Sequence, residues 1–325
     1  MRTQKPTVFT PLVDPTRLGE ILERLRRAYG PEHLASDPLE FSHRFGAPED
    51  REVVALISSA LAYGSAPQIR AGLQRIFDWM GPHPARFVME MDPARELRRF
   101  AGFKHRWNSG ADVVALAWAI GRMREEAGSI GGFFASTHDP EEPTIRGSMS
   151  RFVRRALALD MRGVWPRGKA PVGSYYGYFF PDAARGSSCK RLCLFLRWVV
   201  RPADGVDLGL WPNVGAHQLV IPLDTHVARI ATYLGLTSRK THDWIMAEEI
   251  TAALRAFDPR DPVKYDFAIS RLGILDLCTR RVVPDRCRVC YIRDACAIPG
   301  RWSGDDAERE SDGEGSEVPR EHLPG

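Results

Sequence analysis

The sequence CTRRVVPDRCRVCYIRDAC, residues 278–296, holds four of the six cysteines of this 325-residue chain, with the spacing C-x8-C-x2-C-x5-C. A C-x2-C pair supplies two adjacent thiolates from one turn, and the flanking cysteines can complete a set of four around a metal centre. The segment therefore predicts a small ordered module at the C-terminal end of the fold. Its candidate metal ligands are Cys278, Cys287, Cys290 and Cys296.

The spacing alone leaves the occupant of this module open. An iron–sulfur cluster and a zinc ion both accept four thiolates. Disulfides are another alternative, because four cysteines can pair in three ways, and free thiols are a further one. Six cysteines in 325 residues are too few for a disulfide scaffold, so a metal or cluster is favoured.

Upstream of the cysteines, the composition is that of a globular protein with two domains, or with one large domain and extensions. Hydrophobic residues make up 44% of the chain and charged residues 26%. No apolar run reaches the roughly 18 residues of a membrane span. The first 15 residues lack the apolar core of a signal peptide. We therefore expect a cytoplasmic protein with reduced cysteines and no membrane partner.

Positive charge is concentrated before residue 301. Residues 1–300 carry 42 bases and 33 acids, a net charge of +9, whereas residues 301–325 carry three bases and eight acids. Arginine supplies 39 of the 45 bases in the whole chain. Guanidinium groups bind phosphates bidentately, so a polyanionic partner is one interpretation. A high genomic GC content also enriches arginine, and it is the alternative.

Hydrophobic periodicity predicts an all-α protein, since apolar residues recur at helical spacing and few runs alternate as strands do. Residues 135–147 and 161–182 are expected as loops, the second of them rich in aromatic side chains. The acidic, Gly- and Ser-rich segment 301–325 is expected to be a disordered tail. The main predicted helices cover residues 16–29, 52–62, 67–79, 111–126, 148–159, 188–200, 225–234, 241–257 and 262–277.

The stretch Gly186-Ser-Ser-Cys-Lys190 opens the predicted helix 188–200. A helix N-terminus presents free N–H groups and the positive end of the helix dipole, which suits a phosphate group. The candidate phosphate contacts are therefore Gly186, Ser187, Ser188 and Arg191. Lys190 stands in the first turn at the rim of a packed helix, and it is a candidate amine nucleophile. A solvated surface lysine is the simpler alternative.

The stretch Leu223-Asp-Thr-His226 opens the predicted helix 225–234. Asp224 is well placed as its N-cap, and capping could be its whole role. The functional interpretation is a carboxylate presented at a cleft, where it could stabilise positive charge or activate water. His226 is a candidate phosphate contact, although a packed or capping histidine is the simpler explanation.

The segment Pro222–Ile230 resembles the V-D-T-H-x-x-R-[VI] segment of endonuclease III and the adenine-specific mismatch glycosylases, which belong to the helix-hairpin-helix DNA glycosylase superfamily. The Asp of that segment is catalytic in the superfamily, and Asp224 matches it. The cysteine segment is similar to their C-terminal loop, C-x6-C-x2-C-x5-C, which holds a [4Fe–4S] cluster. The first gap is two residues longer here. The resemblance implies a [4Fe–4S] cofactor rather than zinc.

Two features depart from that superfamily. Lys190 matches its Schiff-base lysine, but the usual L-P-G-[VI]-G-x-[KY]-T-A hairpin is absent, and residues 186–192 occupy the comparable place. The gap of 34 residues between Lys190 and Asp224 resembles that of the archaeal 8-oxoguanine glycosylase branch, which also has an altered hairpin. The helix around residues 56–63 is similar to an early helix of endonuclease III, with Leu61 where that family has a DNA-wedging Gln.

The pattern also resembles a bacterial family, the domain-of-unknown-function 2400 proteins. Three blocks carry this resemblance, which spans nearly residues 15–298: Asp37–Phe41, Lys190–Trp198 and Pro222–His226. The family implies no substrate.

Together the resemblances imply an endonuclease III-like architecture, with two helical lobes around a central cleft. Residues 1–45 and 222–300 would form one lobe, closed by the cysteine module, and residues 46–215 would form a helical barrel lobe with the hairpin-like element. Lys190 and Asp224 would face each other across the cleft.

The leading hypothesis is a monomeric DNA repair glycosylase, with or without AP lyase activity, that excises a damaged or modified base from double-stranded DNA. Lys190 would attack C1′ and Asp224 would activate it. The aromatic loop 175–180 would stack on the extruded base or simply pack in the core. The basic loop beside the cysteines would face DNA through Arg280, Arg281, Arg286 and Arg288.

Two alternatives stay open. A non-enzymatic nucleic-acid-binding protein would keep the fold without the chemistry, and the missing hairpin and Leu61 favour it. An iron–sulfur redox-sensing regulator would use the cluster itself as the active part.

Overall fold

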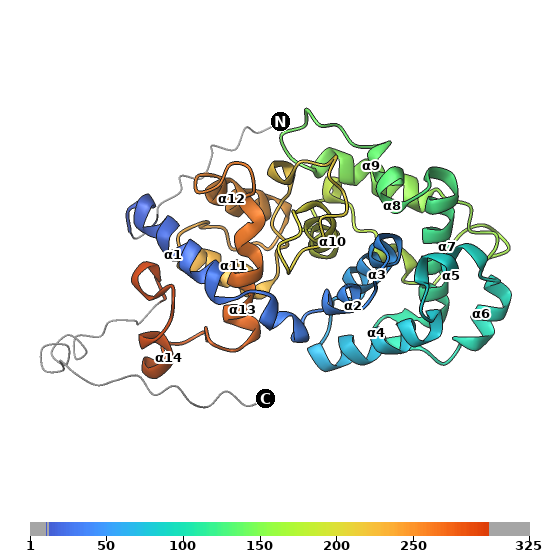
Figure 1. Ribbon diagram of the computed structural model, residues 1–325, viewed down its shortest axis with the longest axis horizontal. Helices are drawn as coiled ribbons and strands as arrows, with labels where there is room; N and C mark the ends of the chain where they lie inside the picture. Colours follow the sequence, from blue (N-terminus) through green and yellow to red (C-terminus); the bar gives the residue numbers. More distant parts are fainter. Residues whose placement is uncertain (1–10, 12, 299–325) are drawn as a thin grey trace, which may run out of the picture.

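The computed structural model describes residues 11 and 13–298, and in this part of the chain it confirms an all-α fold (Figure 1). The only strands described, Lys104–His105 (β1) and Asn108–Ser109 (β2), form one antiparallel hairpin. The predicted acidic tail, residues 301–325, lies outside the described residues. The α-helices are α1 (Pro15–Ala28), α2 (Glu40–His43), α3 (Pro48–Ala60), α4 (Ala66–Met80), α5 (Pro84–Glu90), α6 (Pro93–Arg99), α7 (Gly110–Ala127), α8 (Ile130–Ala135), α9 (Arg146–Leu157), α10 (Lys190–Val200), α11 (Thr225–Tyr233), α12 (Trp244–Arg255), α13 (Asp266–Ile274) and α14 (Pro284–Arg288).

Several helices begin where a short polar side chain binds the free N–H groups of the first turn. Asp14 accepts a hydrogen bond from Arg17 N at the start of α1, at 3.0 Å. Ser65 precedes α4 and forms a capping box with Gln68. This capped serine separates α3 from α4, the counterparts of the predicted helices 52–62 and 67–79.

The helices from the two ends of the described chain pack together on one side of the molecule (Figure 1). Helix α1 contacts α13, and α13 contacts α11. The helices from the middle of the chain form the other side, where α7 contacts α5, α6 and α8. Residues 15–28 thus lie beside residues 266–274, far away in the sequence.

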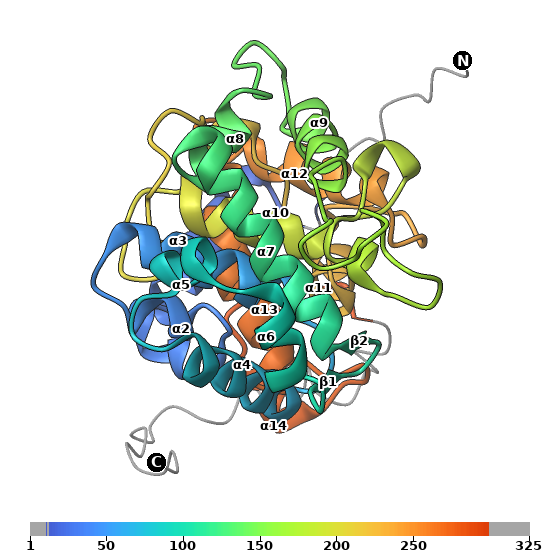
Figure 2. The same cartoon turned by 90° about the vertical axis from the view of Figure 1, so that its right-hand side faces the viewer.

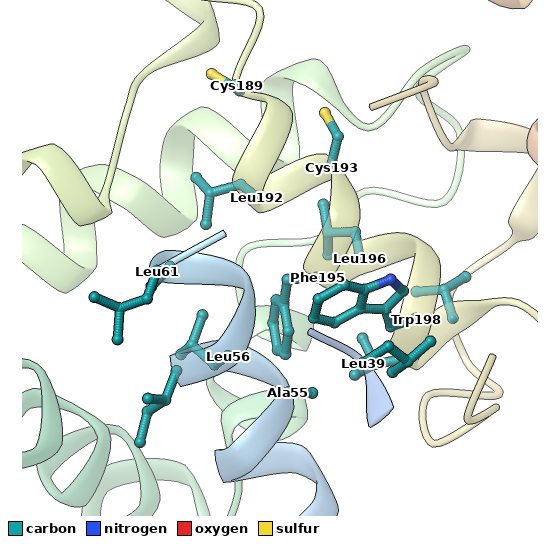
Figure 3. Close-up of a cluster of buried hydrophobic side chains, with 14 of the residues drawn as sticks. Leu39, Ala55, Leu56, Leu61, Cys189, Leu192, Cys193, Phe195, Leu196 and Trp198 are labelled. Carbon is teal, nitrogen blue, oxygen red and sulfur yellow. The ribbon is translucent and has the colours of Figure 1, made fainter. Parts of the chain in front are cut away.

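Helix α10 is buried between these two groups of helices (Figures 1 and 3). Its side chains Leu192, Phe195 and Trp198 are buried, and α10 packs against α3. In the close-up, Phe195 points toward Leu56 of α3. Because packing holds this helix on several faces, the position of its first residue, Lys190, is set by the core.

A buried ionic network anchors the C-terminal half of α10. The Arg197 side chain donates to Asp207 at 3.2 Å and also to Asp266. Arg201 donates to Asp261 at 2.9 Å and also pairs with Asp207. Asp207 therefore lies buried between two guanidinium groups. Charges in such a setting are stable only when each has a partner, so the network fixes the register of α10.

Several predicted boundaries are wrong by a few residues. Helix α10 begins at Lys190 rather than residue 188, because Cys189 adopts a left-handed conformation with φ 49°. Helix α12 begins at Trp244 rather than residue 241, because Asp243 caps it. Helices α5, α6 and α8 were not predicted, because helices of six or seven residues are too short to display a hydrophobic period.

Across residues 11 and 13–298, no helix combines the length and the apolar character that crossing a lipid bilayer requires.

Replacing Asp207 by Asn is expected to lower the free energy of unfolding by about 1.5–3 kcal/mol, because it removes the carboxylate that two buried guanidinium groups share. Each guanidinium then keeps only its remaining carboxylate partners. Urea unfolding of the purified protein measures this. Asp204→Asn is the matched control, since the Asp204 side chain is 36% exposed and exposed ion pairs contribute about 1 kcal/mol or less. Equal losses in the two variants would contradict the assignment of Asp207 to the network.

Candidate active site

An open cavity of about 790 Å³ lies where α10, α11 and α13 meet the turn between α3 and α4. Its lining spans the chain from Asp37 to Ile274. The fold therefore brings into one place segments that are far apart in the sequence. Six of the residues predicted for the site line this cavity: Ser187, Ser188, Lys190, Arg191, Asp224 and His226.

The structure brings the two predicted catalytic residues together. Lys190 Nζ lies 3.4 Å from Asp224 Oδ2. Lys190 is the first residue of α10, and Asp224 is the N-cap of α11. Their side chains are 34% and 17% exposed, so the pair is largely enclosed but open to a ligand in the cavity.

Asp224 uses its two carboxylate oxygens differently. Oδ1 accepts hydrogen bonds from His226 N at 2.9 Å and from Val227 N at 2.8 Å, which is N-cap geometry. Oδ2 faces Lys190. Capping therefore orients the carboxylate, and it leaves one oxygen for the amine.

In the turn before α10, the two serines line the cavity, whereas Gly186 does not. Ser187 and Ser188 line it, but no side chain caps α10, and Ser187 Oγ instead accepts from Cys189 N at 3.3 Å. Gly186 has a left-handed φ of 82° and is not part of the lining. Its carbonyl accepts from Trp244 N at 3.3 Å. Gly186 therefore shapes the turn, whereas the two serines reach the cavity.

Arg191 lines the cavity as a largely buried wall residue, and its role as a phosphate contact stays a prediction. It is only 7% exposed. Its guanidinium lies 3.9 Å from the ring centre of Tyr178 and 5.0 Å from that of Tyr63, and Nη1 donates to Ala60 O at 2.8 Å. Burial lowers the pKa of Arg191. No carboxylate of the described chain forms an ion pair with it, so the wall carries a positive charge.

The floor of the cavity holds acids and bases that the sequence analysis did not single out. Asp37 pairs with Arg271, and Asp266 pairs with Arg197. Burial raises the pKa of Asp266 to about 6, although the positive charge of Arg197 opposes the shift. A charged residue inside an otherwise apolar helix such as 192–200 is the signal that could have indicated these buried pairs.

His226 and Leu61 are held by packing. A Cβ atom on Gly273 would lie 2.2 Å from His226 Nδ1, so the histidine ring rests directly on α13. His226 nevertheless lines the cavity. Leu61 is buried in the core and does not reach the surface (Figure 3).

The aromatic side chains of the loop 175–180 are of two kinds, buried and exposed. Tyr176, Phe179 and Phe180 are buried, so for them core packing is the correct interpretation. Tyr175 and Tyr178 are exposed, and Tyr178 lines the cavity.

The four predicted ligand cysteines line one small pocket together with three apolar residues and two polar ones, which are Leu277, Ile292, Ile298, Thr279 and Arg293. None of the four forms a disulfide in the described part of the chain. Burial raises the pKa of Cys278 to about 11, and the neighbouring thiols add to the shift. In the described part of the chain, no three His, Cys, Asp or Glu side chains are arranged to hold a metal ion. The four cysteines therefore lie close together, but the [4Fe–4S] cluster stays a prediction.

The arginines beside the cysteines are on the surface. Arg280 and Arg281 are exposed, and Arg288 lies 3.8 Å from Asp285. Arg286 donates to the Asp276 carbonyl at 2.6 Å. None of these four arginines belongs to the cavity lining, so the structure does not bring them together with Lys190 and Asp224.

Comparison with known proteins yields one family. The sequence profile of a family described as "Protein of unknown function (DUF2400)" matches residues 37–275. The matched span includes Lys190 and Asp224, and it ends before the first cysteine of the C-terminal segment. No curated protein and no solved structure matches the chain.

Protein purified without oxygen is expected to contain about four irons per chain, because each thiolate of a [4Fe–4S] cluster binds a different iron. Cys290→Ser is expected to lower the iron content, whereas Cys193→Ala, a buried cysteine outside the segment, is expected to leave it unchanged. Elemental analysis and visible absorption measure both. One zinc ion per chain, or no metal at all, would contradict the cluster.

Proposed function

This chain belongs to the DUF2400 family, and we propose that it is a DNA glycosylase that excises a damaged or modified base through Lys190 and Asp224. The observation that carries the proposal is the 3.4 Å separation between Lys190 Nζ and Asp224 Oδ2 inside a cavity. A nucleophilic amine needs a base close to it, and separations slightly above hydrogen-bonding distance are common in ligand-free sites.

The volume of the cavity and its position between two lobes fit an extruded nucleotide. About 790 Å³ lies within the usual range of 300–1,000 Å³ for small-ligand sites. We assign one helical lobe to residues 1–45 and 222–300 and the other to residues 46–215, in an endonuclease III-like arrangement. The cavity draws residues from both lobes, which supports its assignment as the central cleft.

The charge of the lining favours an anionic ligand. Five cationic side chains and three carboxylates line the cavity. The carboxylates pair with Lys190, Arg197 and Arg271. The positive charge of Arg191 has no carboxylate partner in the described chain, so a phosphodiester at the cavity mouth would be attracted. Ser187 and Ser188, at the start of α10, offer hydroxyl groups to the same phosphate.

The proposed reaction uses Lys190 and Asp224 in turn. Asp224 accepts a proton from the Lys190 ammonium, and the free amine attacks C1′ of the extruded nucleotide. The N–C1′ bond to lysine forms as the bond to the base breaks, and the base leaves with the electron pair and takes the proton that Asp224 accepted. The carboxylate that Asp224 regains then stabilises the cationic sugar. Ring opening then gives a Schiff base, from which a lyase step can follow.

The cysteine module is a structural part of this proposal. We assign its four thiols as the ligands of a [4Fe–4S] cluster, which would order the segment 276–296 and present Arg280, Arg281, Arg286 and Arg288 to DNA. Zinc is the alternative occupant.

A second candidate function is nucleic-acid binding without chemistry. One observation favours it: Asp224 already has a structural role as the N-cap of α11. Binding of duplexes with abasic sites or damaged bases, with neither nicking nor base release, is the outcome that would support this candidate.

Lys190→Ala is expected to abolish borohydride trapping of the protein on DNA with an abasic site, because no other lysine among the described residues lines the cavity. Lys240→Ala is the matched control, since Lys240 is an exposed lysine outside the cavity lining. Gel separation of the covalent complex measures trapping. Robust trapping by Lys190→Ala would remove Lys190 from this role.

Asp224→Asn is expected to slow base release by about 10²- to 10⁴-fold, because the variant loses the proton acceptor. The variant should melt like the native protein, since Asn caps helices as well as Asp does. Single-turnover release of a labelled base and thermal melting separate the two roles. Unchanged release would contradict catalysis by Asp224.

A further inference from the structure

We propose that the β1–β2 hairpin and the segment 173–178 form a stacking ledge for an unpaired nucleobase beside the cavity. The stacking ledge consists of the side chains of Trp107 and Tyr175, with Arg106 next to them. This inference rests on the nucleic-acid-binding part of the proposed function, and it adds a contact that the Lys190–Asp224 site does not include.

The two aromatic rings are exposed and adjacent. Trp107 is 53% exposed and Tyr175 46% exposed. Their ring centres are 6.2 Å apart with an angle of 29° between the planes. The Arg106 guanidinium lies 5.6 Å from the Trp107 ring centre. Every nucleobase has a π face, and aromatic rings with arginine are the usual platform for bases outside a duplex.

The ledge is held in place by a buried carboxylate. Asp112, near the start of α7, accepts hydrogen bonds from Ser109 N at 2.8 Å, from Ser174 Oγ at 2.6 Å and from Tyr175 N at 3.1 Å. One aspartate therefore ties the hairpin to the segment that carries Tyr175. Asn108 Nδ2 adds a bond to the Tyr175 carbonyl at 3.0 Å. The backbone segments that carry the two rings are therefore ordered before binding, which lowers the conformational entropy that binding costs.

The hairpin turn also directs its two side chains outward. Arg106 and Trp107 are the two residues between the strands, and Arg106 has a positive φ of 50°. Two-residue turns with positive φ match the twist of paired strands. Figure 2 shows the hairpin at the edge of the molecule, beyond the start of α7.

The ledge adjoins the cavity. Tyr63, a lining residue, donates through its hydroxyl to His105 O at 3.1 Å, and its carbonyl lies 3.0 Å from His105 Nε2. A Cβ atom on Gly64, which also lines the cavity, would lie 3.1 Å from Arg106 Cδ. The Arg106 side chain thus lies against the edge of the cavity at Gly64. A nucleotide inside the cavity would leave its neighbouring base over the ledge.

Charge identifies the ligand as a nucleic acid rather than a peptide or a lipid chain. Four exposed basic residues belong to the hairpin and to the loop that leads to Tyr175. None of them forms an ion pair with an acid in residues 11 and 13–298. An apolar aromatic surface flanked by unneutralised cations matches an aromatic polyanion. The four residues are Lys104, Arg106, Arg167 and Lys169.

The test measures binding of the full chain to two probes, a fluorescent oligothymidine and a duplex with one abasic site. Trp107→Ala is expected to weaken both complexes by about 5- to 150-fold, which is the usual effect of removing one aromatic stacking partner. Trp107→Phe should recover most of the affinity. Met89→Ala is the control, since Met89 is an exposed apolar residue of α5 outside the ledge.

Salt dependence separates stacking from charge. The slope of log K against log salt should stay unchanged in Trp107→Ala, because no phosphate contact is lost. In Arg106→Ala the slope should fall by about 1. Tyr175→Ala should weaken binding in the same way as Trp107→Ala, which provides a second variant if the first one melts at a lower temperature. Native affinity in both alanine variants would overturn the ledge.

The outcomes distinguish this inference from the proposed function. If Lys190-dependent trapping is found and binding does not depend on Trp107 or Tyr175, the ledge is wrong and the glycosylase proposal stands. If trapping fails but binding depends on the two rings, the ledge stands and the protein binds nucleic acid without this chemistry.

Discussion

The burial of α10 is the constraint on which the rest of the structure depends. This helix packs against α3, and its Arg197 forms buried ion pairs with Asp207 and Asp266. These contacts fix the position of the helix. Lys190 is its first residue, so the amine is placed by the core rather than by a mobile loop. The cap of α11 then brings one oxygen of Asp224 to 3.4 Å from that amine. A rigid pair with little freedom to lose is what a catalytic site requires.

Local chemistry made much of this predictable from the sequence. The N-cap role of Asp224 and the helices around Lys190 follow from side-chain type and apolar spacing, because helix starts are decided by nearby residues. The meeting of Lys190 with Asp224 was expected only from resemblance, since nothing within either segment encodes a contact across 34 residues. The short helices were not predicted, because they span too few residues to show a hydrophobic period. The β1–β2 hairpin was not predicted, because strands of two residues show no alternation of apolar and polar residues.

Burial was the harder property to predict. Arg191 follows Lys190 directly and carries the same charge, yet it turns inward between two tyrosine rings. Which neighbour of a helical pair faces the core depends on distant segments, here residues 60–63 and 178. The burial of Asp37 and Asp266 was not predicted either, because their ion-pair partners lie on helices that are distant in the sequence. The cysteine segment was readable as a set of ligands, but its bound group depends on geometry that spacing does not specify.

The central claim is that the amine of Lys190, beside Asp224, reacts with C1′ of a nucleotide held in the cavity. Peptide mapping by mass spectrometry, after borohydride reduction of the protein with DNA that carries an abasic site, tests it most directly. The account predicts a single sugar adduct on the peptide that contains Lys190. An adduct on another residue, or none at all while the DNA remains bound, would contradict it.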